Sequence, residues 1–173
     1  GNLAGTFDDL ICEALMAERD AEIALSPGFR WGATLLPGDD ITFEAVTNQT
    51  AITYANAYRT EMTGSFLKEV LEDVADNIFN PDPYQQQGGD MVRTGGLGFT
   101  IDLGRRIGQR ISGLTLLRSG QPIEAGKTYV VSGWASVNEG TEGPAIYDVV
   151  SRYVEHKKLI RTDPKPHIRV VGL

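Results

Sequence analysis

The 173-residue sequence has few of the residues that build metal centres and disulfides. It contains one cysteine, Cys12, and two histidines, His156 and His167. A single thiol excludes a disulfide framework within the chain. The sequence also lacks H-x-x-x-H, C-x-x-C and D-x-H spacings, whereas a two-metal hydrolytic site needs several such ligands. We therefore predict that this chain holds no metal ion and no catalytic residue of its own.

Long apolar runs and an excess of positive charge are also absent. No apolar run reaches 18 residues and no charged-then-apolar segment opens the chain, so neither a membrane span nor a signal peptide is predicted within it. The net charge of -7 argues against general nucleic-acid binding, which needs a basic face. The first five residues read as mid-chain sequence, and we expect further sequence upstream.

Local features leave some interpretations open. Cys12 stands among Leu10, Ile11 and Leu15, which favours a packed small hydrophobe over a nucleophile. Basic residues gather in two places, where they form either solvated loop ends or a docking surface for an acidic partner. These residues are Arg105, Arg106 and Arg110, then His156, Lys157, Lys158 and Arg161.

Hydrophobic periodicity predicts the secondary structure. Helices are predicted over residues 6–18, 64–79 and 146–155, with Thr6 and Thr63 as N-caps and one or two helical turns over 42–47. Extended segments or strands are predicted over 21–25, 51–61, 97–103, 110–118, 128–136 and 167–171. Helices and strands alternate early and strands cluster late. This order indicates an α/β (α+β) fold with mixed sheets and outer helices.

The segment 64–79 is the clearest amphipathic helix. Its predicted buried face consists of Phe66, Leu67, Val70, Leu71, Val74 and Ile78. Lys68 and Glu72 form an i, i+4 pair on the opposite face, where a solvated role is expected.

Two loops carry the candidate recognition chemistry. The first, residues 26–32, follows a predicted strand and displays Arg30 between two aromatic residues. The second, residues 84–96, is polar, rich in glycine and contains Asp90 and Arg93. An arginine on such a loop can bind a phosphate- or sulfate-like oxyanion, or it can form a structural salt bridge. The sequence pattern alone leaves both roles open.

Several segments resemble the C-terminal domain of 5'-nucleotidases, in family order. They are residues 10–15 (LICEAL), 23–25 (IAL) with the Gly-x-Arg loop at 28–30, 62–64 (MTG) and 95–102 (GGLGFTID). The resemblance covers about residues 1–155 and implies a 5'-nucleotidase C-terminal-domain-like fold that binds substrate. Residues 156–173 are then a C-terminal extension that packs on the same domain.

A closer resemblance within that superfamily is to the SoxB thiosulfohydrolases of bacterial sulfur oxidation. It rests on residues 25–32 (LSPGFRWG), 48–54 (NQTAITY), 77–84 (NIFNPDPY), 87–93 (QGGDMVR) and 133–138 (GWASVN). The resemblance implies a periplasmic enzyme with two manganese ions in a separate N-terminal metallophosphoesterase domain. It also implies the SoxYZ carrier protein as substrate, with sulfate released from a thiosulfonate on the carrier cysteine.

The resemblance implies substrate-binding residues but no catalytic ones in this chain. Arg30 is carried over from the Gly-x-Arg motif and would hold the sulfonate oxygens. The other candidates rest on their place in distinctive loops. They are Trp31, Gln87, Asp90, Arg93 and Asn138.

Two alternatives stay open. In a nucleotidase, two aromatic rings sandwich the base; here the first aligns with Gln49 and the second falls near Tyr147. Half of that sandwich is therefore missing, which favours a sulfonate or phosphate substrate without a purine. The other alternative is a non-catalytic module that only docks a carrier protein.

Overall fold

A computed structural model describes residues 3–28, 34–51, 54–136, 140–161 and 167–172. Within these ranges the chain forms four α-helices, which are α1 (Thr6–Arg19), α2 (Phe43–Thr50), α3 (Gly64–Phe79) and α4 (Ile146–Lys157). The strands are β1 (Ile23–Ser26), β2 (Tyr58–Thr63), β3 (Arg93–Gly95), β4 (Leu97–Asp102), β5 (Ile111–Leu116), β6 (Gln121–Pro122), β7 (Thr128–Gly133) and β8 (Ile168–Val171). A 3-10 turn, η1 (Pro83–Gln85), follows α3.

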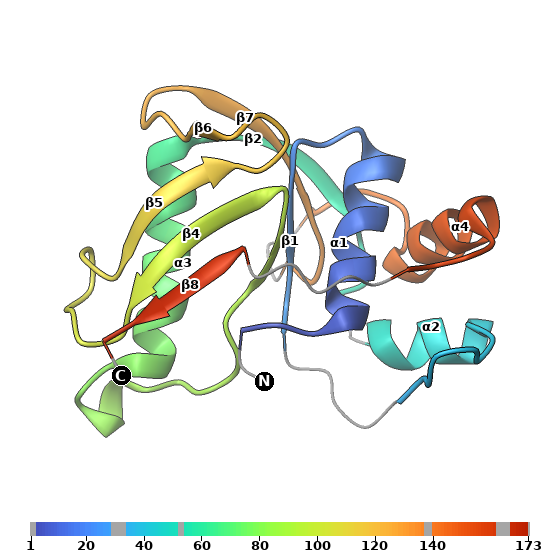
Figure 1. The fold of residues 1–173 in the computed structure, drawn as a ribbon, viewed down its shortest axis with the longest axis horizontal. Helices are drawn as coiled ribbons and strands as arrows, with labels where there is room; N and C mark the ends of the chain where they lie inside the picture. The colour runs from blue at the N-terminus through green and yellow to red at the C-terminus, as the bar shows by residue number, and fades with distance from the viewer. Residues whose placement is uncertain (1–2, 29–33, 52–53, 137–139, 162–166, 173) are drawn as a thin grey trace.

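The strands form two mixed four-stranded sheets. The first has the order β2-β7-β1-β3, with β1 parallel to β7 and antiparallel to β3. The second has the order β6-β5-β4-β8, with β8 parallel to β4. Figure 1 shows the second sheet in front of α3, and α1, α4 and α2 gathered on the other side of β1. The α/β fold predicted from the sequence is confirmed.

Strand β1 is buried on both faces, which explains its unbroken apolar sequence. Ala24 packs into the core formed with α1, α2 and α4. Ile23 and Leu25 point to the opposite face and pack into the core around α3. The predicted strand over 21–25 is therefore confirmed with a shift of one or two residues.

Helix α3 packs between the two sheets through a narrower stripe than its sequence predicts. Leu67, Leu71 and Ala75 are buried against strands of both sheets. Phe66 was expected on this face, but 47% of its surface is exposed. Part of the apolar surface of the helix therefore lies outside the core.

Two charged residues expected in solvent are buried: Glu72, on α3, and Arg110, which packs against that helix. Glu72 accepts hydrogen bonds from the backbone N–H groups of Gly108, Arg110 and Ile111. The Arg110 side chain is 1% exposed and forms a salt bridge with Asp76. The predicted solvated roles of Glu72 and Arg110 are thus wrong, because the β4–β5 turn folds back onto α3. The predicted Lys68–Glu72 ion pair does form, at 3.9 Å.

The helix caps differ in one respect from the sequence prediction. The Thr63 hydroxyl accepts a hydrogen bond from the Phe66 N–H, which confirms Thr63 as the N-cap of α3. Thr6 is the first residue of α1 and Gly5 is its N-cap, without a side-chain cap. Asp8 and Asp9 occupy the first turn, where the helix dipole favours negative charge.

The C-terminal part of the chain contributes a helix to the group around α1 and a strand to the second sheet. Helix α4 runs through residue 155 to Lys157, and β8 pairs with β4. The predicted division into 1–155 and 156–173 stays a prediction. None of the helices in the described ranges combines the length and apolarity that crossing a membrane requires.

Candidate functional site

The two loops singled out in the sequence meet at one cavity. Strand β1 runs antiparallel to β3, with Ser26 opposite Arg93. The loop that leaves β1 therefore lies beside the loop that enters β3. Between them is a cavity of about 360 Å³. Its lining is formed by Leu25, Ser26, Pro27, Gly28, Tyr58, Val70, Val74, Gly88, Gly89, Asp90, Val92 and Trp134.

Trp134 and Tyr58 give the cavity an aromatic wall. The Trp134 indole N–H donates to the Ser26 hydroxyl at 2.8 Å, which fixes the ring at the end of β1. The Tyr58 ring packs over Gly133, where a Cβ would collide with the phenol. Burial raises the pKa of Tyr58, so the phenol stays neutral and can donate or accept a hydrogen bond. The wall is therefore apolar except for the Trp134 indole N–H and the Tyr58 hydroxyl.

The backbone is strained just beyond this wall. Ala135 has a φ of 62°, a left-handed conformation that a side chain disfavours. Such strain persists only where surrounding contacts hold it in place, and it is found preferentially at functional sites. Ala135 directly follows Trp134 and stands three residues before Asn138 in the sequence.

Arg93 lies beneath the two loops with its side chain 6% exposed. Its Nε donates to Asp8 at 3.1 Å, and its Nη2 donates to Asp90 at 3.3 Å. The same guanidinium donates to the carbonyl oxygens of Gly28, at 3.0 Å, and Met91, at 3.3 Å. One side chain thus joins α1, the loop after β1 and the loop before β3.

The carboxylates around Arg93 outnumber its charge. The Asp8 side chain is 14% exposed and the Asp90 side chain 7%. Burial raises the pKa of Asp8 above its ordinary value, although the hydrogen bond and charge of Arg93 oppose that rise. Among the described residues, these two carboxylates therefore share one cation.

The structure places the sequence-predicted site residues in different settings. Asp90 and Arg93 come together at the cavity edge. Gln87 precedes the lining residue Gly88 and is exposed to solvent. Arg30, Trp31 and Asn138 lie outside the described residues.

Other lining residues were not selected from the sequence. Ser26 and Trp134 belong to segments that carry the SoxB resemblance, so a signal for them existed. Tyr58, Val70 and Val74 reach the cavity only because β2 and α3 fold beside β1. No motif marks those three positions.

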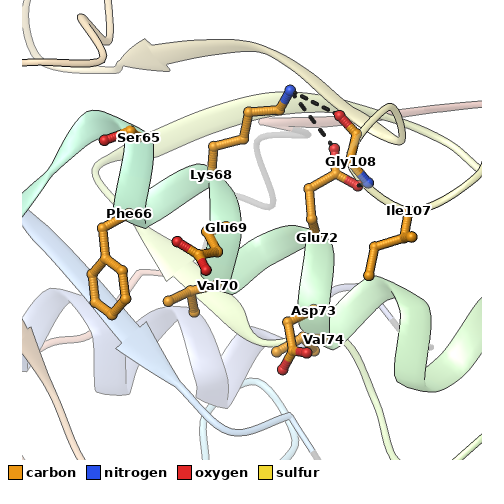
Figure 2. Close-up of a pocket in the computed structure, with 10 residues that line it drawn as sticks. All are labelled: Ser65, Phe66, Lys68, Glu69, Val70, Glu72, Asp73, Val74, Ile107 and Gly108. Carbon is orange, nitrogen blue, oxygen red and sulfur yellow. Dashed lines mark hydrogen bonds and ion pairs between the residues drawn. The ribbon is translucent and has the colours of Figure 1, made fainter.

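A second, larger cavity lies on the outer side of α3. Its volume is about 560 Å³, and it includes Phe66, Val70, Val74 and Ile107. In Figure 2, Lys68 reaches from the same helix to the Gly108 carbonyl, at 3.1 Å, and towards Glu72. Val70 and Val74 line both cavities, so the two adjoin along the helix.

The described residues do not present a metal site or a reactive thiol. No group of three His, Cys, Asp or Glu side chains gathers as metal ligands would in the described ranges. Cys12 is buried in the core, as expected, and burial raises the pKa of its thiol. A thiol held neutral in this way is a poor nucleophile.

The positions compared with a nucleotide-base sandwich do not form one in the described structure. Gln49 is buried on α2, with 9% of its surface exposed. Tyr147 contacts Phe43 instead, with ring centroids 6.4 Å apart and an interplanar angle of 83°. An edge-to-face pair leaves no parallel gap between the two rings for a base.

Sequence and structure comparisons define the class of this protein. The family described as 5'-nucleotidase, C-terminal domain, matches residues 3–152. The chain belongs to this family, whose characterised fold is the one observed here. A comparison with curated protein sequences found no match.

Within this class the chain is similar to SoxB. The sulfate thiohydrolase SoxB of Thermus thermophilus, solved in complex with glycerol, is 33% identical with a TM-score of 0.90. The match covers 99% of this chain and 33% of SoxB, so the chain spans about a third of that protein.

Solved nucleotidases share the fold at lower identity. The 5'-nucleotidase precursor from Thermus thermophilus is 17% identical, with a TM-score of 0.73 over 97% of this chain and 36% of its own. A putative 5'-nucleotidase from Staphylococcus aureus is 17% identical, with a TM-score of 0.76 over 98% and 37%. These likenesses show the fold alone.

Proposed function

We propose that this chain is the substrate-binding C-terminal domain of a periplasmic SoxB-type thiosulfohydrolase. The substrate is a cysteine S-thiosulfonate on the SoxYZ carrier, and the product is sulfate. The observation that carries the proposal is the meeting of the loops 26–28 and 88–90 at one cavity, since both belong to the segments that resemble SoxB. The similarity to the Thermus protein over 99% of this chain supports the same assignment.

The chemistry of the site fits recognition of an anionic group on a protein arm. Arg30 follows the lining residue Gly28 by two positions and would hold the sulfonate oxygens as a bidentate donor. The aromatic and valine wall would accept the apolar part of the arm. Trp31, Gln87, Asp90 and Asn138 would contact the arm at the cavity rim.

Hydrolysis itself requires groups that the described residues do not supply. In the proposed reaction, the water oxygen bonds to the sulfonate sulfur as the sulfur–sulfur bond breaks. Sulfate leaves, and the sulfur that stays on the carrier cysteine takes up a proton. Two manganese ions in an N-terminal metallophosphoesterase domain of the same protein would activate that water.

A direct substrate comparison tests this proposal. The full-length protein, loaded with manganese, is assayed for sulfate release from thiosulfonate-bearing SoxYZ and for phosphate release from AMP. We expect sulfate release to dominate and Arg30→Ala to lower its kcat/KM at least tenfold, a loss of about 1.4 kcal/mol in transition-state stabilisation.

The nucleotidase alternative gives the opposite result. AMP would then be the better substrate, and the exposed ring of Phe43 beside Tyr147 would be the first place to search for base contacts. If neither substrate is turned over while SoxYZ still binds, the chain belongs to a non-catalytic docking module.

A further inference from the structure

We propose that Arg93 is a positioning residue, which fixes the loop leading to Arg30 against the loop 88–90 and does not contact substrate. This inference rests on the proposed function for the identity of the substrate. It revises the expectation from the sequence that Arg93 binds substrate.

Arg93 connects three separate segments of the chain. Asp8, Gly28 and Asp90 are far apart in sequence, and the Arg93 guanidinium donates a hydrogen bond to each of them. Asp8 lies on α1, which runs beside β1 (Figure 1). The helix therefore provides a rigid anchor, and the arginine transmits its position to two loops that have little regular structure of their own.

Gly28 fits closely against Arg93. A Cβ on this residue would lie 2.6 Å from the Met91 carbonyl oxygen and 2.7 Å from the Arg93 Cζ. The Gly28 backbone is thus pressed directly against the guanidinium plane. The contact and the hydrogen bond to the Gly28 carbonyl together hold this part of the loop, and Arg30 follows only two residues later in the chain.

The charges around Arg93 also disfavour direct contact with an anionic substrate. Protein groups hold the donors of the guanidinium: Asp8 and Asp90 accept two of its hydrogen bonds, and the Gly28 and Met91 carbonyl oxygens accept two more. An anion could take any of these donors only by displacing one of those groups. Two carboxylates beside one cation also repel an anionic substrate. Arg93 is therefore suited to hold protein groups, whereas the oxyanion needs another cation.

The test uses the full-length protein with Arg93→Lys, which keeps the charge but removes the planar fork. Arg110→Lys is the matched control, since Arg110 is also buried and paired with a carboxylate but lies away from the cavity lining. We expect Arg93→Lys to lower kcat/KM for sulfate release at least tenfold, because displacement of a binding group by about 1 Å can cost a hundredfold. Arg110→Lys is expected to change kcat/KM less than threefold.

A double-mutant cycle separates positioning from direct contact. If Arg93 acts through Arg30, Arg93→Lys lowers kcat/KM less than threefold in an Arg30→Ala background. If Arg93 touches substrate independently, the tenfold loss is repeated in that background and the proposal is overturned. Equal losses for Arg93→Lys and Arg110→Lys would likewise overturn it, since they would indicate a general stability effect.

Hydrogen–deuterium exchange supplies a readout that does not depend on the substrate. Peptides covering residues 24–28 and 86–92 should exchange faster in Arg93→Lys than in wild type, and no faster in Arg110→Lys. Unchanged exchange in Arg93→Lys rejects the positioning role, whatever the enzyme hydrolyses. If the wild-type protein releases no sulfate but Arg93→Lys still exchanges faster than wild type, only the proposed function is rejected. If Arg93→Lys fails to fold, Asp8→Asn replaces it, because this variant weakens the same contact. The same two peptides should then exchange faster in Asp8→Asn than in wild type, and unchanged exchange would reject the positioning role.

Discussion

Two arginines are buried in the described part of the domain, and they serve different parts of it. Arg93 is shared by Asp8 and Asp90 and by the carbonyl of Gly28, so it joins one helix to two loops. Arg110 pairs with Asp76 and donates to the Phe79 carbonyl, so it joins the start of β5 to the end of α3. The first cluster borders the candidate cavity, and the second braces two regular elements. Similar ion pairs thus set loop geometry in one place and element packing in the other.

The largest expected effect comes from removing the cation from each cluster. Arg93→Met leaves two largely buried carboxylates without their shared partner, and we expect a loss of about 3–5 kcal/mol in the free energy of unfolding. Arg110→Met leaves Asp76 hydrogen-bonded to Asn80 and partly solvated, and about 1–3 kcal/mol is expected. Urea unfolding of both variants measures the difference. Equal losses of unfolding free energy would contradict the proposed difference between Arg93 and Arg110.

The next largest effect is expected at Glu72, which belongs to the cluster around Arg110. Its carboxylate accepts three backbone N–H groups of the β4–β5 turn and is almost fully buried. Glu72→Ala leaves those donors unsatisfied and should cost about 2–4 kcal/mol. Glu69→Ala, on the outer side of the same helix, is the control and should change stability by about 0.5 kcal/mol or less. A similar loss in both variants would show that Glu72 acts only through helix propensity.

The two clusters should also respond oppositely to acid. Burial raises the pKa of Asp8, so its protonation favours the folded state, and its contribution to stability is lost as the pH rises from 3.8 through the folded pKa. Hydrogen bonds from Arg110 and Asn80 lower the pKa of Asp76, so its contribution is present above pH 3.8 and is lost as the pH falls through the folded pKa.

Asp8→Asn and Asp76→Asn test this contrast by urea unfolding across acidic pH. The destabilisation caused by Asp8→Asn should grow as the pH falls towards 3.8. The destabilisation caused by Asp76→Asn should shrink below that pH. Parallel pH dependences for the two variants would refute the assignment.

The smallest expected effect concerns the helices that carry these carboxylates. Thr63→Ala removes the hydroxyl that caps α3 and should cost about 1 kcal/mol. Thr6→Ala in α1 should cost about 0.5 kcal/mol or less, because the N-cap there is Gly5 and no side chain caps that helix. Thermal unfolding of the two variants decides the point, and a larger loss for Thr6→Ala would reverse the cap assignment.

The elements of the fold were largely predictable because they depend on local pattern. The helix 64–79 begins at its predicted cap, and the strands around residues 97 and 111 are confirmed. Predictions failed where a distant segment changes a residue's surroundings. Glu72 and Arg110 are hydrophilic by type, and only the return of the β4–β5 turn onto α3 buries them.

The sequence by itself determined the family, the fold class and the two loops that border the candidate site, because these follow from motifs and periodicity. Only the tertiary structure decided that Ser26 of β1 pairs with Arg93 of β3. It also decided that Trp134 and Tyr58 line the cavity between the two loops. It also decided that Arg93 pairs with Asp8, on a helix 85 residues away in sequence. Contacts of that range depend on how the sheet orders its strands, which no local pattern encodes.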